Sequence, residues 1–201
     1  MIGVKRSWSV GRLAAATVLA SVALAGCSED GTSPTESPTQ AAPSPSPTQS
    51  SPPTESEAAS EAASAVLRTY FATVDLVRQD SSVPPSELDT VASSTQLTAQ
   101  QNLLKSQRDD GLHQVGDTQI IELKVESVSL DNPATALIDV CWDVSDVDIV
   151  DAEGDSAVAS ERKEVGWTRY TVTNDKWDAA PEDGWRVSGG ADLEKEPCAA
   201  S

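Results

Sequence analysis

Positively charged residues are scarce in this chain of 201 residues. It has 14 lysines and arginines against 32 aspartates and glutamates, and its formal net charge at pH 7 is −18. Proteins that bind nucleic acid need a basic surface for the phosphates, so the composition argues against nucleic acid as a partner. Attraction of the folded surface to an anionic bilayer is disfavoured for the same reason.

Sequence motifs for catalysis and for metal binding are also missing. The chain has no glycine-rich phosphate loop and one histidine, His113, which follows Gly111 where we expect a solvated loop. The acidic residues between positions 139 and 155 do not have the spacing of a calcium-binding EF-hand loop. We therefore predict a protein that is not an enzyme, with no catalytic residue, no cofactor and no metal.

Long apolar runs are limited to one, near the start of the chain. Residues 13–25 are uncharged and consist mainly of Ala, Val and Leu, and the charges before them, Lys5, Arg6 and Arg12, are all positive. A run of about 13 residues is in the range of a secretory signal peptide and is shorter than the roughly 20 residues that span a bilayer. The leader therefore predicts export. Its removal would take three of the 14 basic residues and none of the acidic ones.

The apolar run ends in Leu24-Ala25-Gly26-Cys27, which resembles the lipobox of bacterial lipoproteins, Leu-(Ala/Ser)-(Gly/Ala)-Cys. The resemblance implies that residues 1–26 are a lipoprotein signal peptide, that the Cys27 thiol receives a diacylglyceryl group, and that the chain is cleaved between Gly26 and Cys27. Stable anchoring takes at least two acyl chains, such as palmitate. The alternatives are an ordinary secretory signal with a chance cysteine and an uncleaved anchor helix.

Lipidation of Cys27 would leave two cysteines, Cys141 and Cys198, in a chain exported to an oxidising space. We predict that these two form a disulfide. The loss of chain entropy in the unfolded state would make its contribution to stability about 4 kcal/mol. The alternative is two separate buried thiols. A metal site is disfavoured because neither cysteine has a histidine partner nearby.

Residues 27–56 lack every aromatic residue and every aliphatic residue larger than alanine. Such a segment cannot bury enough apolar surface to fold, so we predict a disordered Ser/Thr/Pro-rich tether. Its Ser-Pro and Thr-Pro pairs favour extended chain at about 3.1 Å per residue, a reach of up to roughly 90 Å. The acidic, alanine-rich composition with such a tether is typical of a high-GC Gram-positive bacterium.

Residues 57–198 are sufficient for one domain. Thr54 and Glu57 have the spacing of a capping box, and helical periodicity follows them. A second short helix is predicted after Pro84-Pro85 and a third from about Thr95 to Asp110. The apolar stripe of the first helix consists of Val66, Leu67, Tyr70, Phe71, Val74 and Val77.

After Gly111 the apolar residues alternate with period two, which predicts strands near residues 121–126, 136–144, 165–172 and 185–188. Turns are expected at 131–133, 151–155 and 174–175. Such a sheet has one dry face, and the amphipathic helices can cover it. The predicted fold class is therefore α+β, with N-terminal helices packed on a curved antiparallel β-sheet.

This order of elements, with a long first helix and a closing Trp185-Arg186-Val187 strand, resembles the nuclear transport factor two-like superfamily. The resemblance implies a cone-shaped domain over residues 57–198. Members of the superfamily include ketosteroid isomerases, polyketide cyclases, transport adaptors and non-catalytic domains of cell-wall and secretion proteins. The fold alone therefore selects no function.

The candidate site residues lie on the predicted strands. Trp142, Trp167 and Trp185 could line a cavity for a small apolar ligand, or they could simply fill the core. Enzymes of the superfamily place an aspartate base inside the cone. Asp139 or Asp143 could supply one here, although we expect that face of the strand to meet water.

These patterns together predict a lipid-anchored extracytoplasmic protein at the outer face of the cell membrane. Its domain would be non-catalytic and would bind an envelope protein or a small apolar ligand. One alternative is a carrier that holds an apolar ligand in a tryptophan-lined cavity. The less favoured alternative is a small isomerase or cyclase. Tyr70 and Tyr170 lie in apolar patterns and are expected in the core rather than in catalysis.

Overall fold

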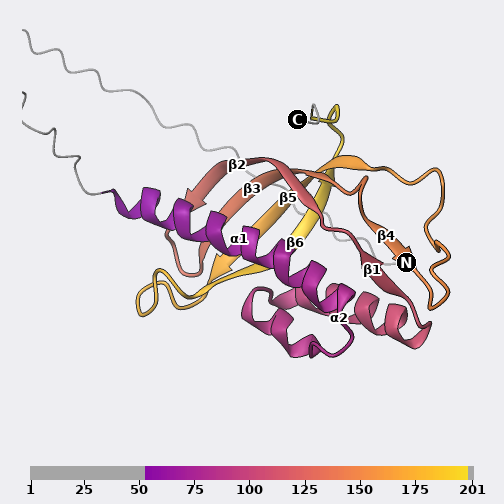
Figure 1. Cartoon of the computed structure of the whole chain (residues 1–201). Coiled ribbons are helices and arrows are strands. Elements are labelled where there is room, and N and C mark those ends of the chain that lie inside the picture. The colour runs from indigo at the N-terminus through magenta and orange to yellow at the C-terminus, as the bar shows by residue number, and fades with distance from the viewer. Residues whose placement is uncertain (1–52, 199–201) are drawn as a thin grey trace, which may run out of the picture. The chain divides into compact units, whose positions relative to one another are not determined.

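The computed structural model of the protein describes residues 53–198. The predicted signal peptide, Cys27 and the tether up to residue 52 lie outside the described residues. The elements are α1 (Glu55–Gln79), the 3-10 helix η1 (Pro85–Thr90), α2 (Ser94–Asp109), β1 (His113–Val115), β2 (Gln119–Ser129), β3 (Ala134–Asp143), β4 (Asp148–Val150), β5 (Val165–Asn174) and β6 (Trp185–Leu193). The predicted α+β class, with helices before antiparallel strands, is confirmed (Figure 1).

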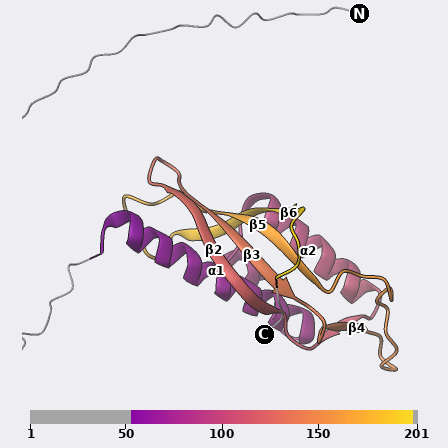
Figure 2. The ribbon, with the colours of Figure 1, turned by 90° about the horizontal axis from the view of Figure 1, so that it is seen from above.

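The main sheet has four antiparallel strands in the order β2-β3-β5-β6. Both α-helices lie on one side of it, so the sheet has an inner face toward the helices and an outer face away from them (Figures 1 and 2). Bulges interrupt the register of β2 against β3 and of β6 against β5. The second of these bulges falls beside the Gly189-Gly190 pair, where the first residue of the pair faces Thr171.

A second, two-stranded sheet was not predicted. The chain leaves the main sheet after Asp143, and β4 pairs with β1 so that Val150 lies opposite His113. The sequence pattern predicted that His113 would lie in a loop, and it indicated no strand between the one near 136–144 and the turn at 151–155. The loop prediction is wrong and β4 was missed, because three-residue strands such as β1 and β4 are too short to produce a visible period of two.

Helix α1 begins with the predicted capping box. The Thr54 hydroxyl accepts a hydrogen bond from the backbone N–H of Glu57 at 3.2 Å, and the Glu57 carboxylate accepts one from the backbone N–H of Thr54 at 2.8 Å. The helix therefore starts at Glu55, inside the C-terminal end of the predicted tether. This cap satisfies donors that a helix N-terminus otherwise leaves free.

The core lies between α1 and the inner face of the sheet. The predicted apolar stripe of α1 is buried apart from Val66, which is partly exposed. It packs on alternate residues of β3, β5 and β6 and on residues from η1 and α2. The largest apolar side chains with 2% exposure or less are Leu67, Val77, Leu88, Leu104, Ile138, Val140, Val172, Trp185 and Val187.

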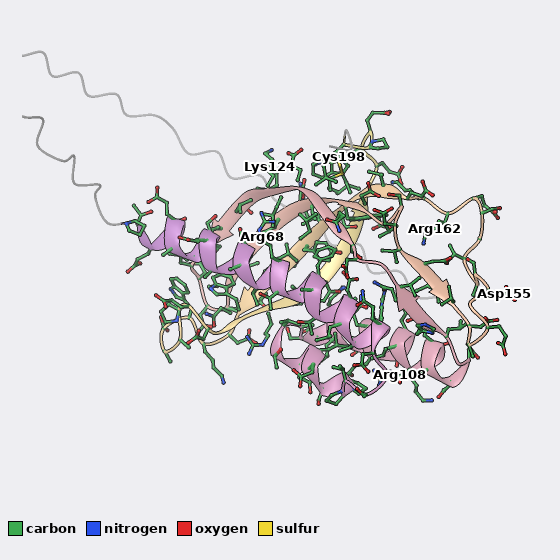
Figure 3. The ribbon with its side chains drawn as sticks, viewed as in Figure 1. Arg68, Arg108, Lys124, Asp155, Arg162 and Cys198 are labelled. Carbon is green, nitrogen blue, oxygen red and sulfur yellow. A yellow bond between two sulfur atoms is a disulfide. The ribbon has the colours of Figure 1, made fainter. Side chains whose placement is uncertain are left out.

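Polar contacts hold the C-terminal half of α1 in place. The Arg108 guanidinium, labelled in Figure 3, donates to the carbonyls of Val77 and Val83 at 2.9 and 2.8 Å and so ties α2 to the end of α1. The Asp75 carboxylate accepts hydrogen bonds from Gln114 and from both the N–H and the hydroxyl of Thr118. These contacts fix the C-terminal half of α1 against α2 and the start of β2.

Candidate functional site

The candidate site is a pocket of about 300 Å³ between α1, α2 and the inner face of β3 and β5. We call it the aromatic pocket. Four of its lining residues are aromatic, and they come from α1, β3 and β5. The lining residues are Tyr70, Phe71, Val74, Arg78, Gln100, Thr118, Trp142, Val144, Lys163, Thr168 and Tyr170.

Three of the aromatic rings pack against one another on the floor of the pocket. Phe71 lies edge-on to Tyr70 and to Tyr170, with ring centroids 5.7 and 5.6 Å apart, and the two tyrosine rings are 6.0 Å apart. All three side chains are buried, so Tyr70 and Tyr170 belong to the core as predicted. Edge-to-face packing of this kind holds each ring in one orientation and gives the floor a fixed shape.

Trp142 forms the wall on the β3 side. Its indole N–H donates to the hydroxyl of Thr168 at 3.0 Å, and that hydroxyl donates to the carboxylate of Asp192 at 2.9 Å. The neighbouring Gly166 makes room for the indole, because a Cβ at this position would lie 2.6 Å from Trp142 Cζ2. The indole is therefore held by one hydrogen-bond chain and one glycine.

The charged groups of the pocket are both cationic. Arg78 reaches it from α1, where its guanidinium donates to the Gln100 side-chain carbonyl at 2.7 Å. Burial lowers the pKa of Arg78, but an arginine remains protonated at any ordinary pH. Lys163 is exposed at the rim. No carboxylate is among the residues that line the pocket.

The two tyrosine hydroxyls are neutral at physiological pH. Burial raises the pKa of Tyr70 and, more strongly, that of Tyr170 above the ordinary value of a phenol. The Tyr70 oxygen accepts a hydrogen bond from the side-chain amide of Gln96. The phenols can therefore donate to a ligand but cannot act as anionic bases near neutral pH.

The three tryptophans predicted to share a cavity lie in different places, so that prediction is corrected. Trp142 lines the aromatic pocket, whereas Trp167 projects from the outer face of β5 under the side chain of Lys195. Trp185 is fully buried in the core and packs edge-on to Trp177. The pattern failed because adjacent strands put Trp142 and Trp167 on opposite faces of the sheet.

The prediction for Asp139 is also corrected. Asp139 and Asp143 were expected to meet water, but Asp139 is fully buried on the outer face. Its two oxygens accept from Arg169 and Lys195, each at 2.6 Å. The Arg169 hydrogen bond, assisted by Lys195, holds the pKa of Asp139 below its usual value against the effect of burial. Neither aspartate lines the aromatic pocket.

Residues 194–198, which we call the C-terminal strap, cover this end of the outer face. A disulfide joins Cys198 to Cys141 on β3, with Cα atoms 6.3 Å apart, as predicted from the cysteine count. The strap is also held by Lys195 on Asp139 and by the Trp167 N–H, which donates to the Glu196 carbonyl at 3.0 Å. Figure 3 places Cys198 on the side of the sheet away from the helices.

Arg78 and Gln100 were not predicted from the sequence. A signal for Arg78 was present, because it follows Tyr70 and Val74 at intervals of four residues and so shares the buried face of α1. An arginine on a core-facing stripe is unusual and needs a partner or a role. Gln100 carried no comparable signal, since α2 has a weak apolar face with Leu104 as its one buried residue.

A second hollow runs along the N-terminal half of α1. This groove of about 710 Å³ is bounded by alanines of α1, by Val91 and by the segment from Glu182 to Arg186. Its acidic side chains, Glu61, Glu182 and Asp183, are exposed, and the half-buried Arg186 donates to backbone carbonyls. It contains no buried polar group turned toward a ligand, so the aromatic pocket is the stronger candidate.

Across residues 53–198, no helix is both long enough and apolar enough to cross a membrane. No protein-family model matches the chain, and no curated protein matches it. The crystal structure of the intermembrane space region of chloroplast protein ARC6 is similar, with a TM-score of 0.49 and 19% sequence identity over 66% of this chain and 95% of that chain. Membership of the nuclear transport factor two-like superfamily stays a prediction.

Proposed function

We propose that this protein is a lipid-anchored, non-catalytic binding protein at the outer face of the cell membrane, and that its domain binds a small aromatic or apolar molecule in the aromatic pocket. The observation that carries the binding function is the pocket itself. A volume of about 300 Å³ is at the small end of the range for ligand sites. Aromatic walls with a few convergent polar groups are the usual composition of such sites.

The polar groups of the pocket suit recognition. Arg78 comes from α1, Gln100 from α2 and Thr118 from the link just before β2, and all three line the same pocket. Gln100 and Thr118 are already hydrogen-bonded within the protein, so their orientation is set before a ligand arrives. A preformed site loses less conformational entropy on binding than a flexible one.

The isomerase or cyclase alternative has less support than binding. Such an enzyme would need a carboxylate base in the pocket, and Asp139 and Asp143 lie on the other face of β3. The nearest carboxylate on α1 is that of Asp75, which accepts three hydrogen bonds from Gln114 and Thr118. Catalysis would need a carboxylate that the pocket lacks, whereas binding requires only the residues that line it.

The location of the protein is proposed from the leader and the tether. The lipobox-like ending at Cys27 supports acylation and retention at the membrane, and the tether would let the domain reach up to roughly 90 Å away from it. The alternative to a small ligand is an envelope protein, which would bind at the same pocket or at another surface. A small ligand is favoured because the pocket has a volume of about 300 Å³.

Titration of the purified full chain with naphthalene-2-carboxamide, followed by calorimetry, tests the binding function. We expect saturable binding that Val144→Trp, which fills the pocket, abolishes. Val115→Trp is the matched control, because Val115 is 41% exposed and lies outside the pocket. Absence of saturable binding by any two-ring probe would refute the proposed ligand site.

The anchor is tested separately in the native host. Cys27→Ala should move the protein from the membrane fraction to the soluble fraction, and mass spectrometry of the wild-type chain should find a lipidated Cys27 as its first residue. An intact leader, or an unmodified first residue, would overturn the proposed anchoring and leave the ligand site unaffected.

A further inference from the structure

Arg78 differs from the other arginines that are partly buried in residues 53–198. Its guanidinium has five N–H donors, and the one hydrogen bond it donates goes to the neutral side chain of Gln100. It takes part in none of the ion pairs of the described residues. The other half-buried arginines each donate to two or more carbonyl or carboxylate oxygens; they are Arg108, Arg162, Arg169 and Arg186.

A partly buried cation with no counter-ion is unfavourable, because removal from water weakens its solvation and nothing in the fold replaces it. Asp75, one turn earlier on α1, raises the pKa of Arg78 through its charge, whereas burial lowers that pKa by more. The Asp75 carboxylate is occupied by Gln114 and Thr118 and forms no ion pair with Arg78. Arg78 lines the aromatic pocket, so its other guanidinium N–H groups can donate hydrogen bonds to a ligand there.

We infer that the aromatic pocket selects small planar ligands that carry a carboxylate, with Arg78 as the counter-ion. This inference rests on the proposed binding function and names its ligand class. An arginine fork matches a carboxylate with two parallel hydrogen bonds, and the partly exposed indole of Trp142 offers a surface to a planar body. The volume of about 300 Å³ limits that body to roughly one or two fused rings.

Lys163 adds a second positive charge at the mouth of the pocket. Its Cε lies 3.0 Å from the position of a Cβ on Gly166, beside the Trp142 ring. The chain as a whole carries a formal charge of −18, which repels anions at long range. Salt screens such repulsion beyond about 8 Å at physiological ionic strength, so the local cations of the pocket decide which ligand binds.

The test uses three probes that share one ring system: 2-naphthoate, naphthalene-2-carboxamide and 2-naphthylmethylammonium. Calorimetric titration of the purified full chain should give 2-naphthoate an affinity at least tenfold higher than that of the amide, and the ammonium the weakest binding. A tenfold ratio corresponds to about 1.4 kcal/mol. Arg78→Gln should bring the naphthoate and amide affinities to within about twofold of each other, with the larger loss of affinity falling on 2-naphthoate. Arg68→Gln, an exposed arginine on the same helix, is the control.

A second variant keeps Arg78 and gives it a carboxylate counter-ion from the protein itself. Gln100→Glu places a carboxylate at the present acceptor of the Arg78 hydrogen bond, so it should remove the preference for 2-naphthoate and raise the melting temperature. Asn102→Asp makes the same charge change on an exposed side of α2 and should do neither. The Gln100→Glu result decides the question if Arg78→Gln does not fold.

The outcomes separate the two proposals. Equal affinity of the wild-type chain for naphthoate and amide, or a preference that survives Gln100→Glu, overturns the carboxylate inference and leaves the proposed binding function in place. Failure of all three probes to bind refutes the ligand site and the inference with it. A naphthoate preference lost in both Arg78→Gln and Gln100→Glu supports both.

Discussion

The two faces of the main sheet are buried by different means. Four consecutive residues of β3, Ile138 to Cys141, are all 0% exposed. Ile138 and Val140 face the helices and contact apolar side chains, whereas Asp139 and Cys141 face outward and are covered by the C-terminal strap. The inner face depends on many interchangeable apolar contacts, and the covered part of the outer face depends on a few specific ones.

This difference predicts how the faces respond to change. Apolar burial contributes to stability in proportion to the buried area, at about 25 cal/mol per Å². On the inner face, only the removal of a large side chain should therefore lower the free energy of unfolding strongly. The strap is held by one disulfide, one ion-pair cluster and one indole N–H. Changes on the outer face should loosen the strap and leave the aromatic pocket intact, because the pocket opens on the inner face.

Trp185→Ala should have the largest effect. Trp185 is 0% exposed, and its removal leaves a cavity that should lower the free energy of unfolding by about 3–5 kcal/mol. Trp167→Ala, on the outer face, should lose less, because the ring lies at the edge of the strap and remains 8% exposed. Chemical denaturation of both variants measures the difference. A loss for Trp167→Ala as large as that for Trp185→Ala would contradict the comparison.

Removal of the disulfide should have the next largest effect. The two cysteines are 57 residues apart in sequence, and loop entropy gives an upper value of about 4 kcal/mol for the lost stability. We expect Cys141→Ala with Cys198→Ala to lower the melting temperature and to keep the affinity for naphthalene-2-carboxamide. Loss of that affinity in a folded double variant would show that the two faces are coupled.

The parts that follow from periodicity were predicted from the sequence, and the parts set by tertiary contacts were not. Helix α1, its capping box and the inner residues of β3 and β5 repeat a simple pattern. Asp139 broke the pattern because its partners, Arg169 on β5 and Lys195 in the strap, are 30 and 56 residues away. Of the three tryptophans predicted to share a cavity, Trp142 alone lines the aromatic pocket, since spacing along one strand does not report which face a neighbouring strand presents.

Asp139→Asn should have an intermediate effect that depends on pH. The partners Arg169 and Lys195 are 39% and 41% exposed and stay hydrated without the carboxylate, so we expect a loss of about 1–2 kcal/mol at pH 7. The ion pairs hold the pKa of Asp139 low, so their contribution is present above the ordinary aspartate pKa of about 3.9 and is lost as pH falls through the lower folded value.

The measurement is the free energy of unfolding of wild type and Asp139→Asn from pH 7 to pH 2. The difference between them should be constant above about pH 5 and should shrink below it, because the carboxyl becomes protonated first in the unfolded and then in the folded state. A difference that stays constant down to pH 2 would mean that Asp139 contributes through packing and not through its charge.

Lys124→Ala should have the smallest effect, although Lys124 is the register neighbour of Asp139 on the same outer face. Its ammonium, labelled in Figure 3, pairs with Glu126 at 2.7 Å, but the Lys124 side chain is 62% exposed. Exposed ion pairs are screened by solvent and contribute little. We expect a melting temperature within experimental error of wild type at both low and high salt. A clear loss that salt suppresses would mean that the uncovered part of the outer face also depends on charge.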